Sequence, residues 1–176
     1  MAIPANAPSG RECFFEEDEI IVSKTDLKGI ITYSNRVFQR VAGYEEEELL
    51  GMNHNCIRHP EMPRCVFQLL WDVLRSGHEI FAYVVNQARN GDHYWVYAHV
   101  TPTLDARGRV IGYHSNRRMP DRAAVAAIEP IYAELLEIEG GFKNRKEGIQ
   151  ASTAALLAKL SDAGVTYDQF VWSLAA

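Results

Sequence analysis

Three strand-like segments joined by short polar turns constrain the fold of this chain more than any other feature. The first segment is rich in Val and aromatic residues, and the second alternates, with Tyr94 and Val96 on one face and Trp95 on the other. Asn90-Gly91 between them is typical of a type I′ hairpin turn. Together the segments predict an antiparallel meander with strands at residues 80–87, 92–102 and 110–116.

The residues before this meander add a second hairpin and a set of helices. Two β-branched runs at 20–25 and 30–34 are separated by the turn Asp-Leu-Lys-Gly. Asn35 is placed to cap a short helix that Gly43 ends. An apolar stripe predicts a longer helix over residues 63–74. This order predicts an α+β domain, in which a five-stranded antiparallel sheet carries helices on one face and encloses a cavity beneath them.

The composition becomes rich in Ala and Leu after Pro120. Three further helices are predicted there, over residues 121–138, 147–160 and 166–174. The first has an apolar stripe, which fits either packing on the chain's own sheet or contact with a partner. We divide the chain into an N-terminal arm or cap (1–18), a core domain (19–120) and a C-terminal helical segment (121–176), and we expect the first ten residues to form a loose arm.

Charge and cysteine content exclude several classes of protein. The 176 residues include 18 Lys and Arg against 23 Asp and Glu, a net charge of −5, which argues against nucleic-acid binding through a basic face. Three cysteines without a close pair argue against a disulfide-stapled secreted domain. No apolar run of about 20 residues and no signal peptide is found, so we expect a cytoplasmic protein without a membrane span. We expect no enzyme activity, since zincin and phosphate-loop motifs are absent.

Several motifs carry a resemblance to a known family. The matching stretches are residues 25–35, 41–44, His54, 58–63, 90–96 and 127–132. They resemble a PAS domain, and more narrowly the flavin-binding PAS domain of bacterial aerotaxis receptors. The run Arg-His-Pro-Glu-Met-Pro and the run Asn-Gly-Asp-His-Tyr-Trp are the parts most specific to this flavin subgroup. The resemblance covers roughly residues 20–135, and it implies a PAS fold for residues 19–120 and FAD as the cofactor.

An FAD site needs an apolar slot for the ring, polar groups at the ring's edge and cationic donors for the pyrophosphate. Arg58 is suited to a bidentate phosphate contact, Asn86 to a pyrimidine-like edge and Trp71 to stacking. Other roles remain open: Asn35 as a helix cap, Arg58 in an ion pair with Glu61, and Trp71 in the core. The candidate cofactor-binding residues are Asn35, His54, Arg58, His59, Phe67, Trp71 and Asn86.

Three functions remain open from the sequence. The first is a soluble FAD-binding sensor of redox state or oxygen for energy taxis. We expect it to signal in trans to a chemoreceptor-like partner, because the length leaves no room for an output module. The second is a haem-binding oxygen sensor, with His54 or His59 as the axial ligand. The third is a ligand-free adaptor or dimerisation module.

Two further expectations concern assembly and light. PAS domains commonly pair through flanking helices and sheet edges, so we expect a homodimer. Light-sensing flavin PAS domains carry a reactive cysteine in a Gly-x-Asn-Cys run. Here Gly51-Met52-Asn53 is followed by His54, which argues against a photochemical adduct on Cys56.

Overall fold

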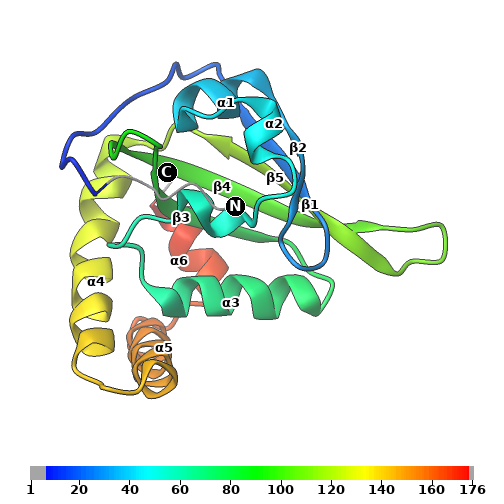
Figure 1. Ribbon diagram of the computed structural model, residues 1–176. Helices are drawn as coiled ribbons and strands as arrows, with labels where there is room; N and C mark the ends of the chain where they lie inside the picture. The colour runs from blue at the N-terminus through cyan, green and yellow to red at the C-terminus, as the bar shows by residue number, and fades with distance from the viewer. Residues whose placement is uncertain (1–6, 175–176) are drawn as a thin grey trace.

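Five antiparallel strands form one sheet in the order β2-β1-β5-β4-β3 (Figure 1). The computed structural model describes residues 7–174 of the chain. The sheet confirms the predicted five-stranded α+β architecture, and it places the first hairpin beside the last strand of the meander through pairing of β1 with β5. The strands are β1 (Ile21–Thr25), β2 (Ile31–Ser34), β3 (Ile80–Gln87), β4 (His93–Leu104) and β5 (Val110–Arg118).

Helices between β2 and β3 cover one face of the sheet. Asn35 caps the first of them by accepting a hydrogen bond from Phe38 N, and Gly43 ends it with a left-handed φ of 73°. Both roles follow the sequence prediction. The covering elements are α1 (Arg36–Ala42), α2 (Glu46–Leu49), the 3-10 helix η1 (His54–Ile57) and α3 (Arg64–Arg75).

The turn between β3 and β4 differs from the predicted type I′ geometry. Gly91 N donates to Ala88 O at 3.0 Å, so the central residues of the turn are Arg89 and Asn90. Gly91 has a φ of 94°, whereas Asn90 does not have a positive φ. A type I′ turn requires positive φ at both central residues. The loop is instead one residue longer and ends in a left-handed glycine.

Part of the N-terminal arm is attached to this hairpin rather than loose. Ser9 N donates to Gly91 O at 2.8 Å, and Cys13 N donates to His93 O at 2.8 Å. The Arg11 guanidinium contacts the Asp92 carboxylate at 2.6 Å. The expectation that the first ten residues form a loose arm is therefore wrong for Ser9, and residues 1–6 lie outside the described part of the chain.

Three helices follow the sheet: α4 (Arg122–Gly140), α5 (Arg145–Asp162) and α6 (Tyr167–Ser173). Tyr132 of α4 donates its hydroxyl to Tyr83 O on β3 at 2.6 Å. Trp172 of α6 contacts the ring of Phe81, with the centroids 6.1 Å apart. Phe81 alternates with the residues that face α3, so α6 lies on the opposite face of the sheet. Helix α4 bonds to a backbone carbonyl of β3, which is an edge strand of the sheet.

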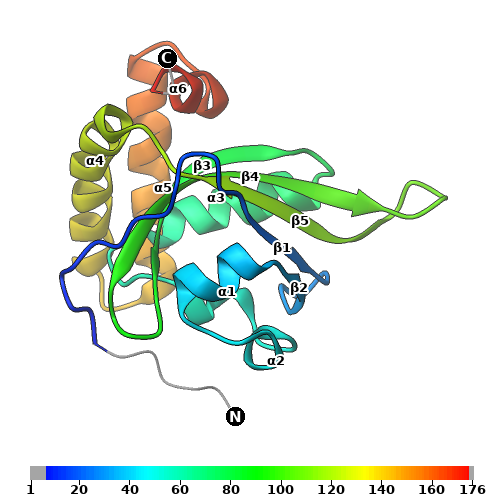
Figure 2. The ribbon, with the colours of Figure 1, turned by 90° about the horizontal axis from the view of Figure 1, so that it is seen from above.

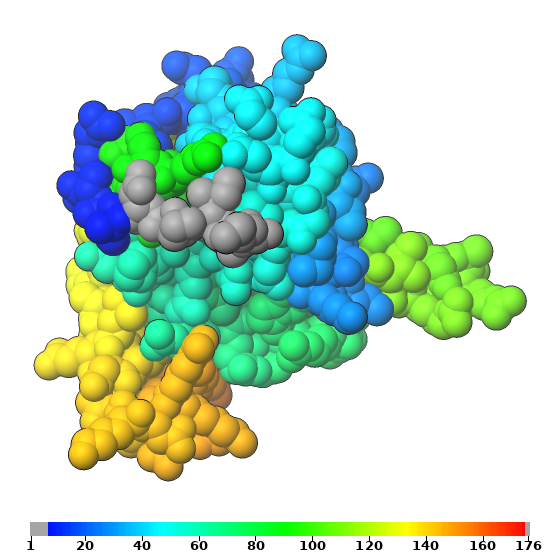
Figure 3. All heavy atoms as spheres, in the orientation of Figure 1, coloured from blue at the N-terminus to red at the C-terminus, as the bar shows by residue number. Residues whose placement is uncertain are grey.

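Helix α5 lies on the side of the sheet that carries α3, and it packs against α3 and α4 (Figure 2). The C-terminal segment therefore reaches both faces of the sheet near β3. The β4–β5 hairpin extends away from these helices as a narrow arm (Figure 3). No helix within residues 7–174 combines the length and the apolar character needed to cross a bilayer.

Candidate functional site

A cavity of about 440 Å³ lies between the sheet and helix α3. Val84, Ala98 and Ser115 from three neighbouring strands line its sheet side, and Phe67 and Leu70 of α3 line the side opposite. The volume lies within the range of roughly 300–1,000 Å³ that is usual for small-molecule sites. The predicted cavity between the sheet and its helices is therefore present.

Five of the predicted site residues line this cavity: His54, Arg58, Phe67, Trp71 and Asn86. The Trp71 ring meets the edge of Tyr113, with the centroids 5.3 Å apart. The Arg58 guanidinium lies 5.1 Å from the centroid of the Phe67 ring and donates to Met62 O at 3.0 Å. These contacts give the cavity an aromatic wall with a cation beside it.

Asn35, by contrast, does not line the cavity. Its Oδ1 accepts from Phe38 N and from Val22 N, each at 3.0 Å, and its Nδ2 donates to Ile20 O at 2.7 Å. The backbone of α1 and β1 therefore uses both ends of this amide. The alternative role as a helix cap is the one that the structure shows.

His59 also lies outside the cavity lining. Its ring packs 5.5 Å from the ring of His93, and its Nδ1 accepts from Glu61 N at 3.2 Å. Burial lowers the pKa of His59 below its usual value. This histidine therefore belongs to the packing of the loop before α3 and does not face the cavity.

Asn86 on β3 has an unused hydrogen-bond donor. The residue is 4% exposed, and its Nδ2 is buried with no hydrogen-bond partner. Leaving a buried donor unpaired costs about 1–3 kcal/mol, so an unpaired amide in a cavity wall indicates a place for a ligand acceptor. The sequence suggests Asn86 for the edge of a flavin ring, and the amide nitrogen of this residue is free to donate to a ligand.

Arg117 on β5 is a site residue that the sequence reasoning missed. It is 2% exposed and lines the cavity, and it lies 4.5 Å from the centroid of the Phe38 ring. One of its nitrogens donates to Ser23 Oγ, while Nε and Nη1 have no hydrogen-bond partner. Burial lowers the pKa of Arg117 to about 10, so the side chain is still charged at neutral pH. A buried cation of this kind favours an anionic or electron-rich ligand.

His54 is half-buried beside this arginine, and its imidazole is neutral. Burial first, and then the charge of Arg117, lower the pKa of His54 to about 3. Its Nε2 lies 3.1 Å from Ser23 Oγ, and its ring stacks on Phe38 with the centroids 5.8 Å apart. Ser23 thus bridges a charged and a neutral side chain at the inner end of the cavity.

Positive charge dominates the cavity. Among the described residues that line it, six are Lys or Arg and none is Asp or Glu, although the whole chain carries a net charge of −5. Burial, and the charges of Arg64 and Arg145, lower the pKa of Arg58, so these guanidinium groups repel one another. Phosphate groups are the ligands that such forked donors bind best. The six are Lys28, Arg58, Arg64, Arg75, Arg117 and Arg145.

A family model described as the PAS fold matches residues 31–117, and the aerotaxis receptor of Escherichia coli (strain K12) is 40% identical over 119 residues. The chain belongs to the PAS family. The match to the receptor covers 68% of this chain and 23% of the receptor. The nitrogen fixation regulatory protein of Klebsiella pneumoniae is 32% identical over 103 residues, covering 58% of this chain and 21% of that protein. The PAS chain therefore corresponds to less than a quarter of the length of these relatives.

Solved structures support the PAS fold. The dark structure of the Aureochrome1 LOV photoreceptor superposes with a TM-score of 0.54 at 21% identity, covering 68% of this chain and 86% of that one. A light-oxygen-voltage domain studied with a flavin analogue superposes with a TM-score of 0.56 at 19% identity. The match covers 65% of this chain and 86% of that one. At these identities the similarity shows the fold alone.

Cys56 of this PAS domain is not placed for cavity chemistry. It is absent from the residues that line the cavity, and burial raises the pKa of its thiol to about 11. A thiol with so high a pKa is a poor nucleophile at neutral pH. The geometry agrees with the sequence argument against a photochemical adduct on this residue.

Proposed function

We propose that this PAS domain binds FAD, senses redox state or oxygen, and passes its state to a separate chemoreceptor-like protein. The observation that carries the proposal is the cationic cavity with an unused amide, that of Asn86, in its wall. The family resemblance to flavin-binding aerotaxis PAS domains, and the E. coli relative named an aerotaxis receptor, support the same choice. We expect sensing by residues 19–120 in the cytoplasm, without catalysis.

The residues present fit the parts of FAD. Trp71 and Phe67 offer aromatic faces beside the apolar lining. The unpaired Nδ2 of Asn86 matches an acceptor at the edge of the ring. The arginines of the cavity match the two phosphate groups. A ligand with an apolar ring at one end and negative charge at the other uses each of these features.

When bound, FAD supplies reversible uptake of electrons and protons at its ring. The chain supplies the response. Asn86 can present either its oxygen or its nitrogen to the cavity by rotating its amide. Phe81, on the opposite face of β3, contacts α6, and the backbone carbonyl of Tyr83 on the same strand accepts a hydrogen bond from Tyr132 of α4. Asn86 thus lies on the same strand as the residues that contact the C-terminal helices, so a change in its hydrogen bonding can reach them through β3. We propose that these helices present the signal to the partner and to a second copy in a homodimer.

The absorption spectrum of the purified protein, incubated with FAD and desalted, tests the proposal. Bound flavin gives a band near about 450 nm, bound haem a band near about 400 nm, and a ligand-free adaptor neither. We expect the flavin band. A haem band would support the alternative oxygen sensor. The candidate axial ligand would then be His54, the histidine that lines the described part of the cavity.

A variant pair tests the assignment of Asn86. Asn86→Leu removes the unpaired donor, so we expect FAD affinity to fall by about tenfold, the worth of one lost hydrogen bond. Asn116→Leu is the control, because Asn116 on β5 precedes Arg117 and so faces away from the cavity. Equal FAD affinity in both variants, measured by fluorescence titration of folded protein, would contradict the role of Asn86.

A further inference from the structure

We propose that α5 closes the mouth of the cavity, and that Arg145 binds a phosphate group of the ligand and so couples occupancy of the cavity to docking of the C-terminal helices. The identity of the ligand as FAD rests on the function proposed above. The coupling itself requires only that the ligand carries a phosphate or pyrophosphate group.

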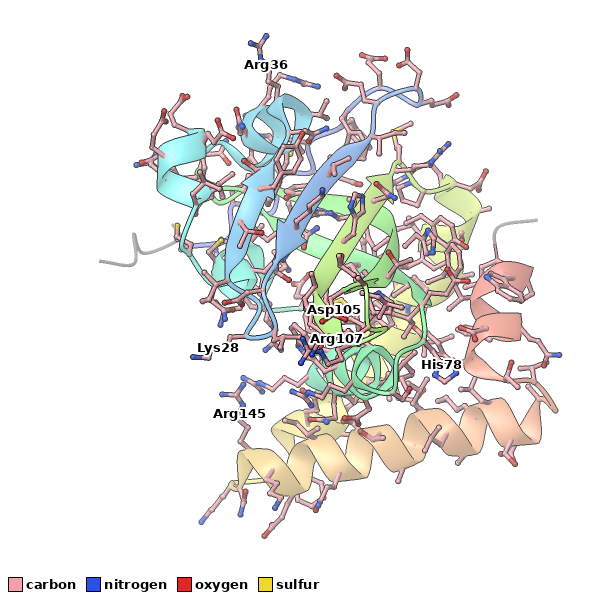
Figure 4. All side chains as sticks on the ribbon, turned by 90° about the vertical axis from the view of Figure 1, so that its right-hand side faces the viewer. Lys28, Arg36, His78, Asp105, Arg107 and Arg145 are labelled. Atoms are coloured by element: carbon pink, nitrogen blue, oxygen red, sulfur yellow. The ribbon has the colours of Figure 1, made fainter. Side chains whose placement is uncertain are left out.

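The position of α5 supports this role. The helix follows the residues 31–117 that match the PAS family, yet two of its residues, Arg145 and Ile149, line the cavity. Residues four apart lie on the same face of a helix, so one face of α5 reaches the mouth. Figure 4 shows Arg145 rising from α5 toward the side of the molecule where Lys28 lies on the β1–β2 turn. The two cations come from opposite ends of the sequence and face one opening.

The charges around Arg145 are not balanced. No ion pair among residues 7–174 includes Arg145. The carboxylate of Glu139 approaches Arg64 only to 3.8 Å, and the Nε of Arg64 is buried without a hydrogen-bond partner. The guanidinium groups of Arg58, Arg64 and Arg145 all line the cavity, and the charges of Arg64 and Arg145 act on Arg58 to lower its pKa. An anion bound among them would relieve their repulsion and join α5 to α3.

The apolar anchoring of α5 comes from Leu156 and Leu160, which are buried in the core and lie in the second half of the helix. Its buried polar link runs through Glu139 of α4, which accepts from Ser152 Oγ at 3.1 Å and from Cys65 N of α3 at 2.9 Å. Its ion pair between Lys159 and Glu134 is exposed and contributes little. Against this background, a phosphate contact at the N-terminal end of α5 adds a direct link between ligand and helix.

Hydrogen exchange and ligand titration of the full chain test the proposal. The test variant is Arg145→Gln, and the control is Lys146→Gln, a neighbouring exposed cation that does not line the cavity. In the unmodified chain and the control we expect FAD to slow amide exchange in α5 by about fivefold. In Arg145→Gln we expect FAD affinity to fall by about tenfold and the slowing to disappear, while riboflavin, which lacks phosphate, binds both variants equally.

ADP separates this proposal from the proposed function. Slower α5 exchange with ADP, dependent on Arg145, in a chain that takes up no flavin would support the coupling and refute the flavin sensor. Normal FAD binding by Arg145→Gln, with the same slowing of α5 exchange as in the control, would overturn the coupling and leave the flavin sensor intact. No change in α5 exchange with either FAD or ADP would also overturn the coupling.

Discussion

A single hydroxyl, that of Ser23, links Arg117 and His54 at the inner end of the cavity. Arg117 donates to Ser23 Oγ, so the hydroxyl hydrogen of Ser23 is available to Nε2 of His54 at 3.1 Å. A neutral imidazole that accepts at Nε2 carries its proton on Nδ1. The chain therefore keeps a neutral ring and a charged guanidinium side by side, with the charge on the arginine.

Acid should destabilise the fold through His54. Its pKa of about 3 lies below the ordinary 6.5, so the unfolded chain takes up a proton first as the pH falls. Stability is then fully present above about pH 6.5 and is lost as the pH falls toward 3. Between about pH 7 and pH 4.5 we expect this residue to lower the free energy of unfolding by about 2–3 kcal/mol.

Urea unfolding at the two pH values measures this loss. His54→Gln, which cannot titrate, should show a correspondingly smaller decrease in the free energy of unfolding. His78→Gln, at an exposed position after α3, should keep the original pH dependence. The same decrease in His54→Gln as in the unmodified chain would contradict the assignment to His54.

The sequence revealed those site residues that stand in motifs or carry a rare chemistry. His54, Arg58, Trp71 and Asn86 were found in this way, and they do line the cavity. Arg117 was missed because a lone arginine near the end of a strand carries no local signal of burial. Only the pairing of β1 with β5 brings it to Ser23.

At the scale of elements, Glu139 holds three helices together. It is the buried acid near the end of α4, and it accepts from the backbone of α3 and from a side chain of α5. Its acceptance from Cys65 N also satisfies a free N–H in the first turn of α3, which has no side-chain cap of its own. The carboxylate is therefore both a helix cap and a tie between helices.

Removing this carboxylate should loosen the C-terminal helices. Glu139→Ala leaves the buried Cys65 N without its acceptor and removes one of the two acceptors of Ser152 Oγ, so we expect the free energy of unfolding to fall by about 2–3 kcal/mol. Glu137→Ala, at an exposed position on the same helix, should change it by no more than about 0.5 kcal/mol. Urea unfolding followed by circular dichroism measures both, and equal values for the two variants would contradict the role of Glu139.

Predictions of elements from the sequence were accurate where periodicity or a turn residue marks them. The five strands and the C-terminal helices were found, because alternating and helical patterns depend on nearby residues. The loop at Asn90-Gly91 was assigned the wrong turn type, since the same residue pair suits loops of two lengths. The position of α5 over the cavity mouth depends on contacts with α3 and α4, and no local pattern encodes it.

At the scale of the whole molecule, charge is distributed unevenly. The chain is acidic overall, but the described lining of the cavity contains cations and no acids. The acidic residues of the described chain therefore all lie outside the lining of the cavity. Such a cavity attracts anionic ligands over distances comparable to the screening length.

Salt should therefore weaken the binding of a phosphate-bearing ligand selectively. Raising sodium chloride from about 0.05 M to about 0.5 M shortens the screening length several-fold, and we expect FAD affinity to fall by about fivefold. Riboflavin, which has no phosphate, should lose less than about twofold under the same change. Fluorescence titration of both ligands measures the difference. Equal salt sensitivity of the two ligands would mean that the cations do not contact the phosphate end.

The placement of Arg145 and Ile149 after the sheet has a consequence for biosynthesis. A ribosome makes the chain from its N-terminus, so all five strands and α3 emerge before α5 does. The nascent sheet can thus fold around a cavity whose mouth is still open, and a cofactor can enter before the last wall arrives. The order of elements along the chain therefore gives a cofactor the opportunity to enter before α5 is made.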